Sequence, residues 1–127
     1  MNQGLGFALI NLWFSAHLCV VDTNKHVTVE SGKHYSLLCD HNLTKPFEIE
    51  WRIENSTVVA GRRVGQIPSY GPGYSFKKVS MSFPEGDLTL KSVSCDDDGI
   101  QYKCMSRSSP SEKYQQGDVY TIQVGGG

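Results

Sequence analysis

The 127-residue chain has almost no excess of charge of either sign. Its 12 basic and 13 acidic residues give a formal net charge of -1. Proteins that bind nucleic acid or an anionic membrane surface through long-range electrostatics carry a clear basic excess. We therefore expect no nucleic acid as a partner, and we expect membrane attachment only through a segment outside this chain.

The sequence also lacks the spacing of a metal site and the motif of a catalytic nucleophile. His26, His34 and His41 fall on separate predicted elements, without the close spacing of zinc ligands. No serine or cysteine lies in a recognisable nucleophile motif. These absences predict a protein that is not an enzyme and that needs no metal or other cofactor.

The N-terminal stretch is uncharged and largely apolar over residues 4–21. Such a run at the start of a chain is typical of a secretory signal peptide, here predicted over residues 1–21. We expect the mature chain to begin between residues 17 and 25. A signal anchor, or an N-terminal strand retained in the domain, are the alternatives.

Two Asn-x-Ser/Thr sequences are present at predicted loops. They are Asn42-Leu-Thr44 and Asn55-Ser-Thr57. This tripeptide is the acceptor for N-linked glycans in secreted proteins. We expect glycans on Asn42 and Asn55 and an extracellular, cell-surface or secreted location.

Thirteen glycines and frequent turn residues favour an all-β chain. The clearest alternation, residues 47–53, places four apolar side chains inward: Phe47, Ile49, Trp51 and Ile53. It turns four charged side chains to solvent: Glu48, Glu50, Arg52 and Glu54. Seven more strands are expected at 26–30, 33–39, 57–60, 78–83, 88–93, 100–105 and 119–124. Within 33–39, Tyr35, Leu37 and Cys39 are expected to point inward, and residues 61–75 are expected to be irregular.

A set of core residues stands out from these strands. Cys39 is followed twelve residues later by Trp51, and Cys104 is preceded by Tyr102 and, four residues earlier still, by Asp98. This set resembles an immunoglobulin-superfamily domain of the variable (V-set) type over residues 25–124. One departure is Ile100, which stands where the family usually has Gly or Ala. The domain is assigned to residues 22–124, with 125–127 as a glycine linker or truncation point.

The resemblance implies a two-sheet immunoglobulin-like sandwich, closed by a disulfide between Cys39 and Cys104. Trp51 is expected to pack against this bridge, and Tyr102 is expected to form a tyrosine corner beside a buried Asp98. A buried carboxylate needs a cation, for which Lys77, Lys78, Arg62 and Arg63 are the candidates.

The resemblance also implies an extracellular recognition domain of a cell-surface immune or adhesion receptor. The expected partner is a protein ligand or a second immunoglobulin domain, bound through one sheet face and the adjoining loops. The face should carry Glu50, Arg52, Gln101, Lys103, Met105 and Val119, and the loop Arg107, Lys113 and Tyr114.

Three other functions remain open. One is an antigen-receptor-type variable chain that pairs with a second variable domain, although residues 116–118 lack the Phe-Gly-x-Gly sequence that the resemblance would require. The others are a structural spacer and a secreted soluble binder of carbohydrate.

Cys95 is left over once the leader and the disulfide are accounted for. An odd cysteine in a secreted protein is an unreactive free thiol, or it is bonded to a second chain or to a cysteine in another part of the same protein. A bond to a second copy of the chain would give a disulfide-linked dimer through Cys95.

Overall fold

The computed structural model describes residues 24–54, 57–75, 77–82 and 85–125. The predicted signal peptide and the predicted glycan site at Asn55 lie outside the described residues. Within these ranges the chain forms no helix long and apolar enough to cross a membrane.

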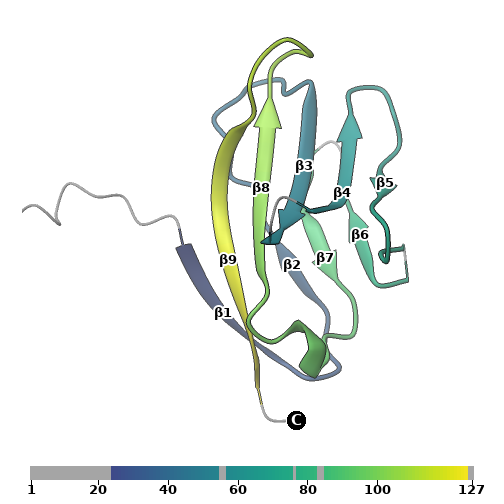
Figure 1. The fold of residues 1–127 in the computed structure, drawn as a ribbon, viewed down its shortest axis with the longest axis vertical. Helices are drawn as coiled ribbons and strands as arrows, with labels where there is room; N and C mark the ends of the chain where they lie inside the picture. The colour runs from purple at the N-terminus through teal and green to yellow at the C-terminus, as the bar shows by residue number, and fades with distance from the viewer. Residues whose placement is uncertain (1–23, 55–56, 76, 83–84, 126–127) are drawn as a thin grey trace, which may run out of the picture.

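The larger of two β-sheets has six strands and faces the viewer in Figure 1. In spatial order they are β1 (Asn24–Glu30), β9 (Gln115–Gly125), β8 (Gln101–Arg107), β3 (Glu48–Ile53), β4 (Thr57–Arg63) and β5 (Ser69–Tyr70). β1 is parallel to β9, and the other neighbours are antiparallel.

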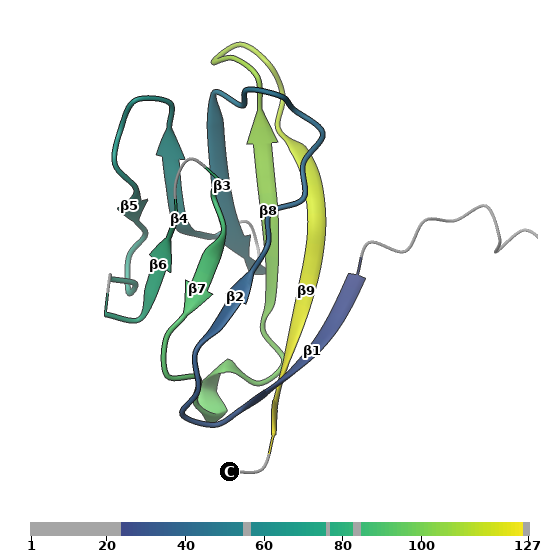
Figure 2. The same ribbon diagram turned by 180° about the vertical axis from the view of Figure 1, so that it is seen from behind.

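The smaller sheet packs behind it and is nearer the viewer in Figure 2. Its order is β2 (Tyr35–Leu37), β7 (Leu88–Leu90) and β6 (Val79–Met81), all antiparallel. A short 3-10 helix, η3 (Cys95–Asp97), connects β7 to β8 at the lower end of the sandwich in Figure 1. The β2–β3 and β8–β9 connections lie at the opposite end.

The space between the sheets holds the core that the alternating pattern predicts. Trp51 has no exposed surface, and its indole nitrogen donates to the carbonyl of Gly86 at 2.7 Å. The predicted disulfide is confirmed: Cys39 and Cys104 are bonded, with 5.6 Å between their Cα atoms. A cross-link over 65 residues of chain stabilises the fold by about 4 kcal/mol in the chain-entropy model. Tyr102 is also buried, and burial raises the pKa of its hydroxyl.

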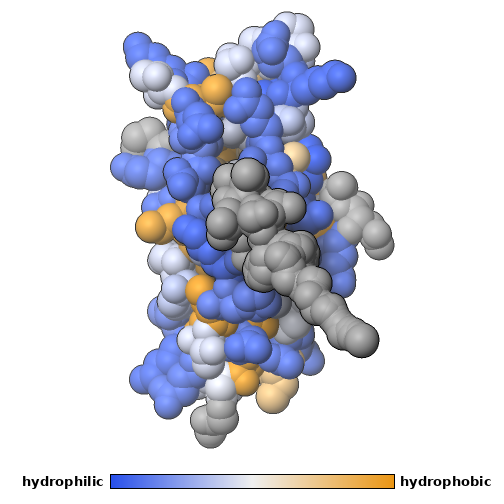
Figure 3. All heavy atoms as spheres, turned by 90° about the vertical axis from the view of Figure 1, so that its left-hand side faces the viewer, coloured by the Kyte–Doolittle hydropathy of each residue, from blue (hydrophilic) through white to orange (hydrophobic). Residues whose placement is uncertain are grey.

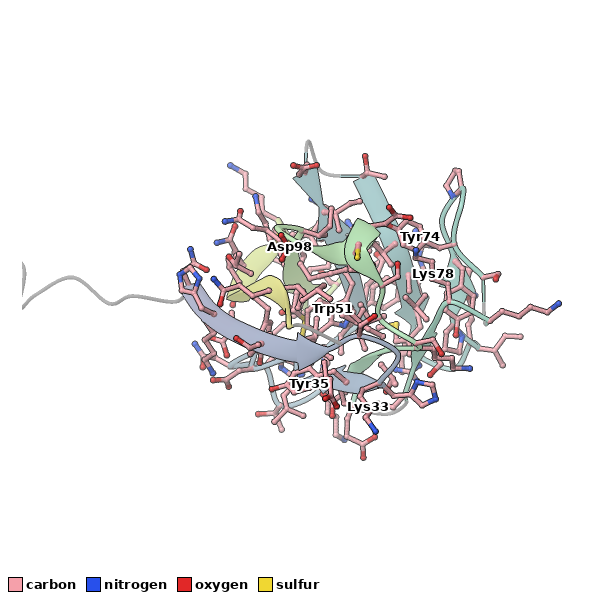
Figure 4. All side chains as sticks on the ribbon, turned by 90° about the horizontal axis from the view of Figure 1, so that it is seen from below. Lys33, Tyr35, Trp51, Tyr74, Lys78 and Asp98 are labelled. Carbon is pink, nitrogen blue, oxygen red and sulfur yellow. A yellow bond between two sulfur atoms is a disulfide. The ribbon has the colours of Figure 1, made fainter. Side chains whose placement is uncertain are left out.

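The prediction that Tyr35 points into the core is wrong. Its side chain is 36% exposed, whereas Trp51 is fully buried, and Figure 4 labels Tyr35 between Trp51 and Lys33. β2 is an edge strand of three residues that begins at Tyr35, and full burial starts only at Leu37.

The tyrosine corner also differs from expectation, because Asp97 and not Asp98 is buried there. Asp97 ends η3, and its side chain accepts a hydrogen bond from the Ser94 amide at 2.8 Å in a capping box. Lys78 is the cation, with its Nζ 3.9 Å from Asp97 Oδ1.

The helical turn η3 is the physical reason why Asp97 is buried in place of Asp98. It directs Asp97 into the sandwich, so Asp98 emerges on the far side and accepts a hydrogen bond from the Val124 amide at 2.9 Å. Figure 4 shows Lys78 beside Tyr74 and Asp98 well apart from both. The expected burial of Asp98 is therefore wrong.

Candidate functional site

The outer face of the larger sheet carries rows of side chains set by strand register. Glu48 on β3 lies opposite Arg107 on β8 and Arg63 on β4. In the next row, Glu50 lies opposite Met105 and Gly61. These rows bring together residues that are far apart in the sequence, because β3 is flanked by β8 and β4.

Glu48 is the buried centre of the first row, where alternation predicted a solvent-exposed side chain. It is only 9% exposed, because two arginines cover it. Arg107 donates from Nε at 2.9 Å and from Nη2 at 2.5 Å to Oε1, and Arg63 Nε approaches Oε2 at 3.4 Å. The expectation of exposure is wrong, since long cationic side chains cover the outer face of the sheet.

The arginines also determine the ionisation of Glu48. Burial tends to raise the pKa of this carboxyl group, but hydrogen bonds from Tyr114, Arg107 and Arg63 outweigh it and lower the pKa below 4.5. In the same way the hydrogen bond to Glu48 raises the pKa of Arg107. Glu48 is therefore a carboxylate at neutral pH.

Tyr114 lies above these rows, between two guanidinium groups. The Cζ atoms of Arg52 and Arg107 are each 4.6 Å from the centre of its ring, which is the geometry of a cation–π contact. Its hydroxyl donates to Glu50 Oε1 at 3.3 Å. Burial is the main cause of the raised pKa of this hydroxyl, with the nearby Glu48 and Glu50 adding to it.

Glu50 links this layer to Arg52. Arg52 Nε and Nη2 are both 2.7 Å from Glu50 Oε2, so the guanidinium is held while it stacks on Tyr114. We call Glu48, Glu50, Arg52, Arg63, Arg107 and Tyr114 the arginine–tyrosine cluster.

Four of the seven predicted ligand-binding residues belong to this cluster: Glu50, Arg52, Arg107 and Tyr114. Lys103 and Met105 lie beside it on β8, and Lys113 is exposed outside it. Sequence reasoning missed Glu48 and Arg63. The alternation that puts Glu48 on the face of Glu50 was a signal for the first, but nothing in the sequence indicated the pairing across strands.

Val119 was expected on the exposed part of this face and is buried, at 8% exposure. β9 is an interior strand, so Lys103 on β8 and Asn24 on β1 flank Val119 on both sides. The side of the molecule at the β1 edge is mostly hydrophilic, with scattered hydrophobic residues, outside the area that grey atoms cover (Figure 3).

A cleft of about 210 Å³ lies next to the cluster, towards β5. Glu48 and Glu50 form one wall, and Ser69 and Tyr70 line the other side. Gly61 lies at the bottom of the cleft, where a side chain would be too close to Glu50: a Cβ at this position would lie 3.0 Å from Glu50 Cγ. The cleft shares Glu48, Glu50 and Arg63 with the cluster.

Cys95 is exposed on η3 and is not bonded to another cysteine of the described chain. It lies at the end of the sandwich away from the β8–β9 connection. Among the described residues, no three His, Cys, Asp or Glu side chains are grouped so as to hold a metal ion.

The model of the immunoglobulin V-set domain family matches residues 22–124. No curated protein matches the sequence. Several solved structures share the fold. A chain of the structure titled "Structural basis of T cell specificity and activation by the bacterial superantigen toxic shock syndrome toxin-1" is 19% identical, with a TM-score of 0.70 over 79% of this chain and 92% of that one.

Two further structures have a similar sequence identity and a somewhat lower TM-score. The V domain of amphioxus IgVJ-C2 is 19% identical, with a TM-score of 0.64 over 77% of this chain and 98% of that one. The first immunoglobulin-like domain of human CD48 antigen is 20% identical, with a TM-score of 0.64 over 79% of this chain and 80% of that one. At this level of identity the likeness concerns the fold.

Proposed function

Because the chain belongs to the immunoglobulin V-set family, we propose that it is the extracellular recognition domain of a cell-surface immune or adhesion receptor. V-set domains are typically binding domains without enzymatic activity, found outside the cell or on its surface. The partner proposed is a protein, bound at the arginine–tyrosine cluster and the neighbouring β8 residues.

The observation that carries this proposal is that the cluster holds its long side chains in place before any partner binds. Tyr114 is held by Arg52 and Arg107, and each arginine is held by a carboxylate. Immobilising such side chains costs free energy on association, so a surface that is already ordered binds at lower cost. Tyrosine and arginine are also the residue types that most often dominate protein interfaces.

An antigen-receptor-type pairing of two variable domains would use the same sheet face, so it remains the second proposal. Gly117 stands in the β8–β9 ladder where the register shifts between Lys103 and Met105. A Cβ at Gly117 would lie 2.6 Å from the Asp40 carbonyl oxygen. The bulge therefore requires a glycine at position 117, as in antigen-receptor chains. The phenylalanine that precedes this glycine in those chains is replaced here by Gln116.

Binding to cells tests the proposal. A fluorescent tetramer of the full chain is used to stain a panel of cells, with Lys103→Glu as the face variant. Its matched control is Lys33→Glu, an exposed residue in the connection between β1 and β2. We expect staining that protease treatment of the cells removes, that Lys103→Glu weakens and that Lys33→Glu leaves unchanged. Absence of staining across the panel, protease-resistant staining or an equal loss in both variants would contradict the proposal.

Cys95 supports the proposal of a disulfide-linked dimer, since it is exposed at the end of the sandwich opposite the β8–β9 connection. A bridge there would leave the arginine–tyrosine cluster uncovered. Non-reducing electrophoresis of the secreted protein should show a dimer that Cys95→Ser abolishes. A monomer for both the wild type and Cys95→Ser would contradict the intermolecular bridge and would show that Cys95 is a free thiol.

A further inference from the structure

A second hollow, of about 380 Å³, lies at the end of the sandwich where the two sheets part. It has no lining residue in common with the arginine–tyrosine cluster, although Arg62 also lines the cleft beside that cluster, and we call it the end hollow. Three elements form its walls: the β2–β3 connection, the end of β4, and the turn between β6 and β7. Its lining residues are His41, Thr44, Lys45, Pro46, Arg62, Val64 and Glu85.

Backbone contacts fix the walls of the end hollow. The Val64 amide donates to the Phe47 carbonyl at 2.8 Å, which ties the end of β4 to the start of β3. The turn beside Glu85 is held by the bond from Trp51 to the Gly86 carbonyl. Gly86 has φ +84°, and a Cβ there would lie 2.7 Å from Ile49 Cδ1, so the turn packs directly on the core.

Cationic groups outnumber anionic ones in the lining. Lys45 and Arg62 are positively charged at neutral pH, against the single carboxylate of Glu85. Arg62 reaches the hollow because it lies opposite Ile49, on the core-facing side of β4, near the end of that strand. His41 accepts from the Leu43 amide through Nδ1 at 3.2 Å, so its other ring nitrogen is left as a donor.

The rest of the lining is apolar. Val64 is 60% exposed, and Pro46 lies on the same hollow. A ligand that fits therefore has a short aliphatic part and an anionic end. A sugar carboxylate would bring several hydroxyl groups as well, and Thr44 supplies the single hydroxyl in this lining to meet them.

We propose that the end hollow binds an acidic side chain, glutamate or aspartate, of the protein partner. The methylene groups lie against Val64 and Pro46, and the carboxylate lies between Lys45 and Arg62. This proposal deepens the recognition function proposed above and rests on it. In this arrangement the arginine–tyrosine cluster contacts the protein partner over a wide area, and the end hollow binds one specific side chain of that partner.

Binding of a small ligand tests the end hollow independently of the arginine–tyrosine cluster. Isotope-labelled full chain is titrated with N-acetyl-glutamate N-methylamide, and the backbone amide signals of Lys45 and Val64 are followed by NMR. The neutral isostere N-acetyl-glutamine N-methylamide and N-acetylneuraminic acid are titrated in parallel. We expect saturable shifts at both amides with the glutamate probe, and much weaker binding of the other two.

Charge variants supply the second readout. Lys45→Gln should weaken binding of the glutamate probe about fivefold, and Glu85→Gln should strengthen it by removing a like charge. Lys33→Gln, at the other end of the molecule, serves as the matched control and should have no effect. The amide spectrum of each variant shows directly whether it is folded.

Three results would overturn the proposal. They are equal binding of the glutamate and glutamine probes, insensitivity to Lys45→Gln, and preference for N-acetylneuraminic acid, which would make the site one for a glycan. Each is independent of the cell-staining result with Lys103→Glu, so a failure of this site and a failure of the proposed function are distinguishable.

Discussion

Glu48 shows how one residue can be acidic, buried and still ionised. It is only 9% exposed, and two guanidinium groups, those of Arg107 and Arg63, donate hydrogen bonds to it. A buried carboxylate without partners would become neutral, whereas this one is held as an anion by its hydrogen bonds. Its charge is therefore linked to the folded state.

The pH dependence of stability follows from the lowered pKa of Glu48. A group whose pKa is lower in the folded chain adds stability above its ordinary value of 4.5, and this stability is lost as the pH falls through the folded-state pKa. We expect Glu48→Gln to lower the free energy of unfolding by about 2 kcal/mol at pH 7. The gap between variant and wild type should close as the pH falls below 4.5.

Urea unfolding followed by tryptophan fluorescence across this pH range measures the gap. Glu112→Gln, an exposed acidic residue in the β8–β9 connection, is the control and should show no gap at any pH. A constant difference between Glu48→Gln and wild type would mean that packing, and not charge, accounts for the loss.

The burial of Asp97, and not Asp98, at the tyrosine corner gives a second prediction. Asp97→Ala leaves the Ser94 amide without its side-chain acceptor and Lys78 without its partner, so we expect a loss of about 2 kcal/mol in unfolding free energy. Asp98→Ala removes one exposed hydrogen bond to Val124 and should cost less than about 1 kcal/mol. Thermal unfolding ranks the two variants, and a larger loss in Asp98→Ala than in Asp97→Ala would contradict the role of Asp97 at this corner.

At the scale of elements, the β8–β9 pair depends on one small residue. A Cβ on Gly117 would lie 2.6 Å from the Asp40 carbonyl oxygen and 3.4 Å from that of Cys104, and both are backbone atoms that do not move aside. We expect Gly117→Ala to cost about 1–3 kcal/mol in unfolding free energy by overpacking. Chemical denaturation measures it, with Gln116→Ala on the neighbouring exposed position as the control.

The same pair of strands shows where prediction from sequence succeeds. Apolar alternation located β3, because Ile49 and Trp51 alternate with charged residues and have no other period. It also found β1, most of β8 and the second half of β9. The cysteines, Trp51 and Tyr102 identified the fold because their spacing depends on a core that many sequences share.

Prediction fails where the ends of strands consist of polar residues. The sequence predicts a loop at Arg107 and Gln115, although these residues end β8 and begin β9. Their partners, Glu48 for Arg107 and Ser106 for Gln115, lie on other strands. A local pattern carries no information on pairing across strands, so the arginine–tyrosine cluster could be predicted only in part.

At the scale of the whole molecule, the loop that carries Asn42 lies exposed at the end opposite η3. We expect an N-linked glycan at Asn42 and another at Asn55, which lies outside the described residues. Glycosidase digestion of protein from a secretory host should lower the apparent mass in two steps, and Asn42→Gln should remove one of them. Occupancy of Asn55 alone would show that the β2–β3 connection is not accessible to the glycosylation machinery.

The parallel pairing of β1 with β9 also determines how the domain bears mechanical load. Asn24 and Gly125 begin and end the two strands at opposite ends of their shared ladder, which runs from Asn24–Val119 to Glu30–Gly125. A force that pulls these ends apart acts along the strands, so it loads the backbone hydrogen bonds together in shear. An antiparallel pair with adjacent ends would open one bond at a time, and at a lower force. We therefore expect the β1–β9 pair to resist tension applied at Asn24 and Gly125 better than such an antiparallel pair would.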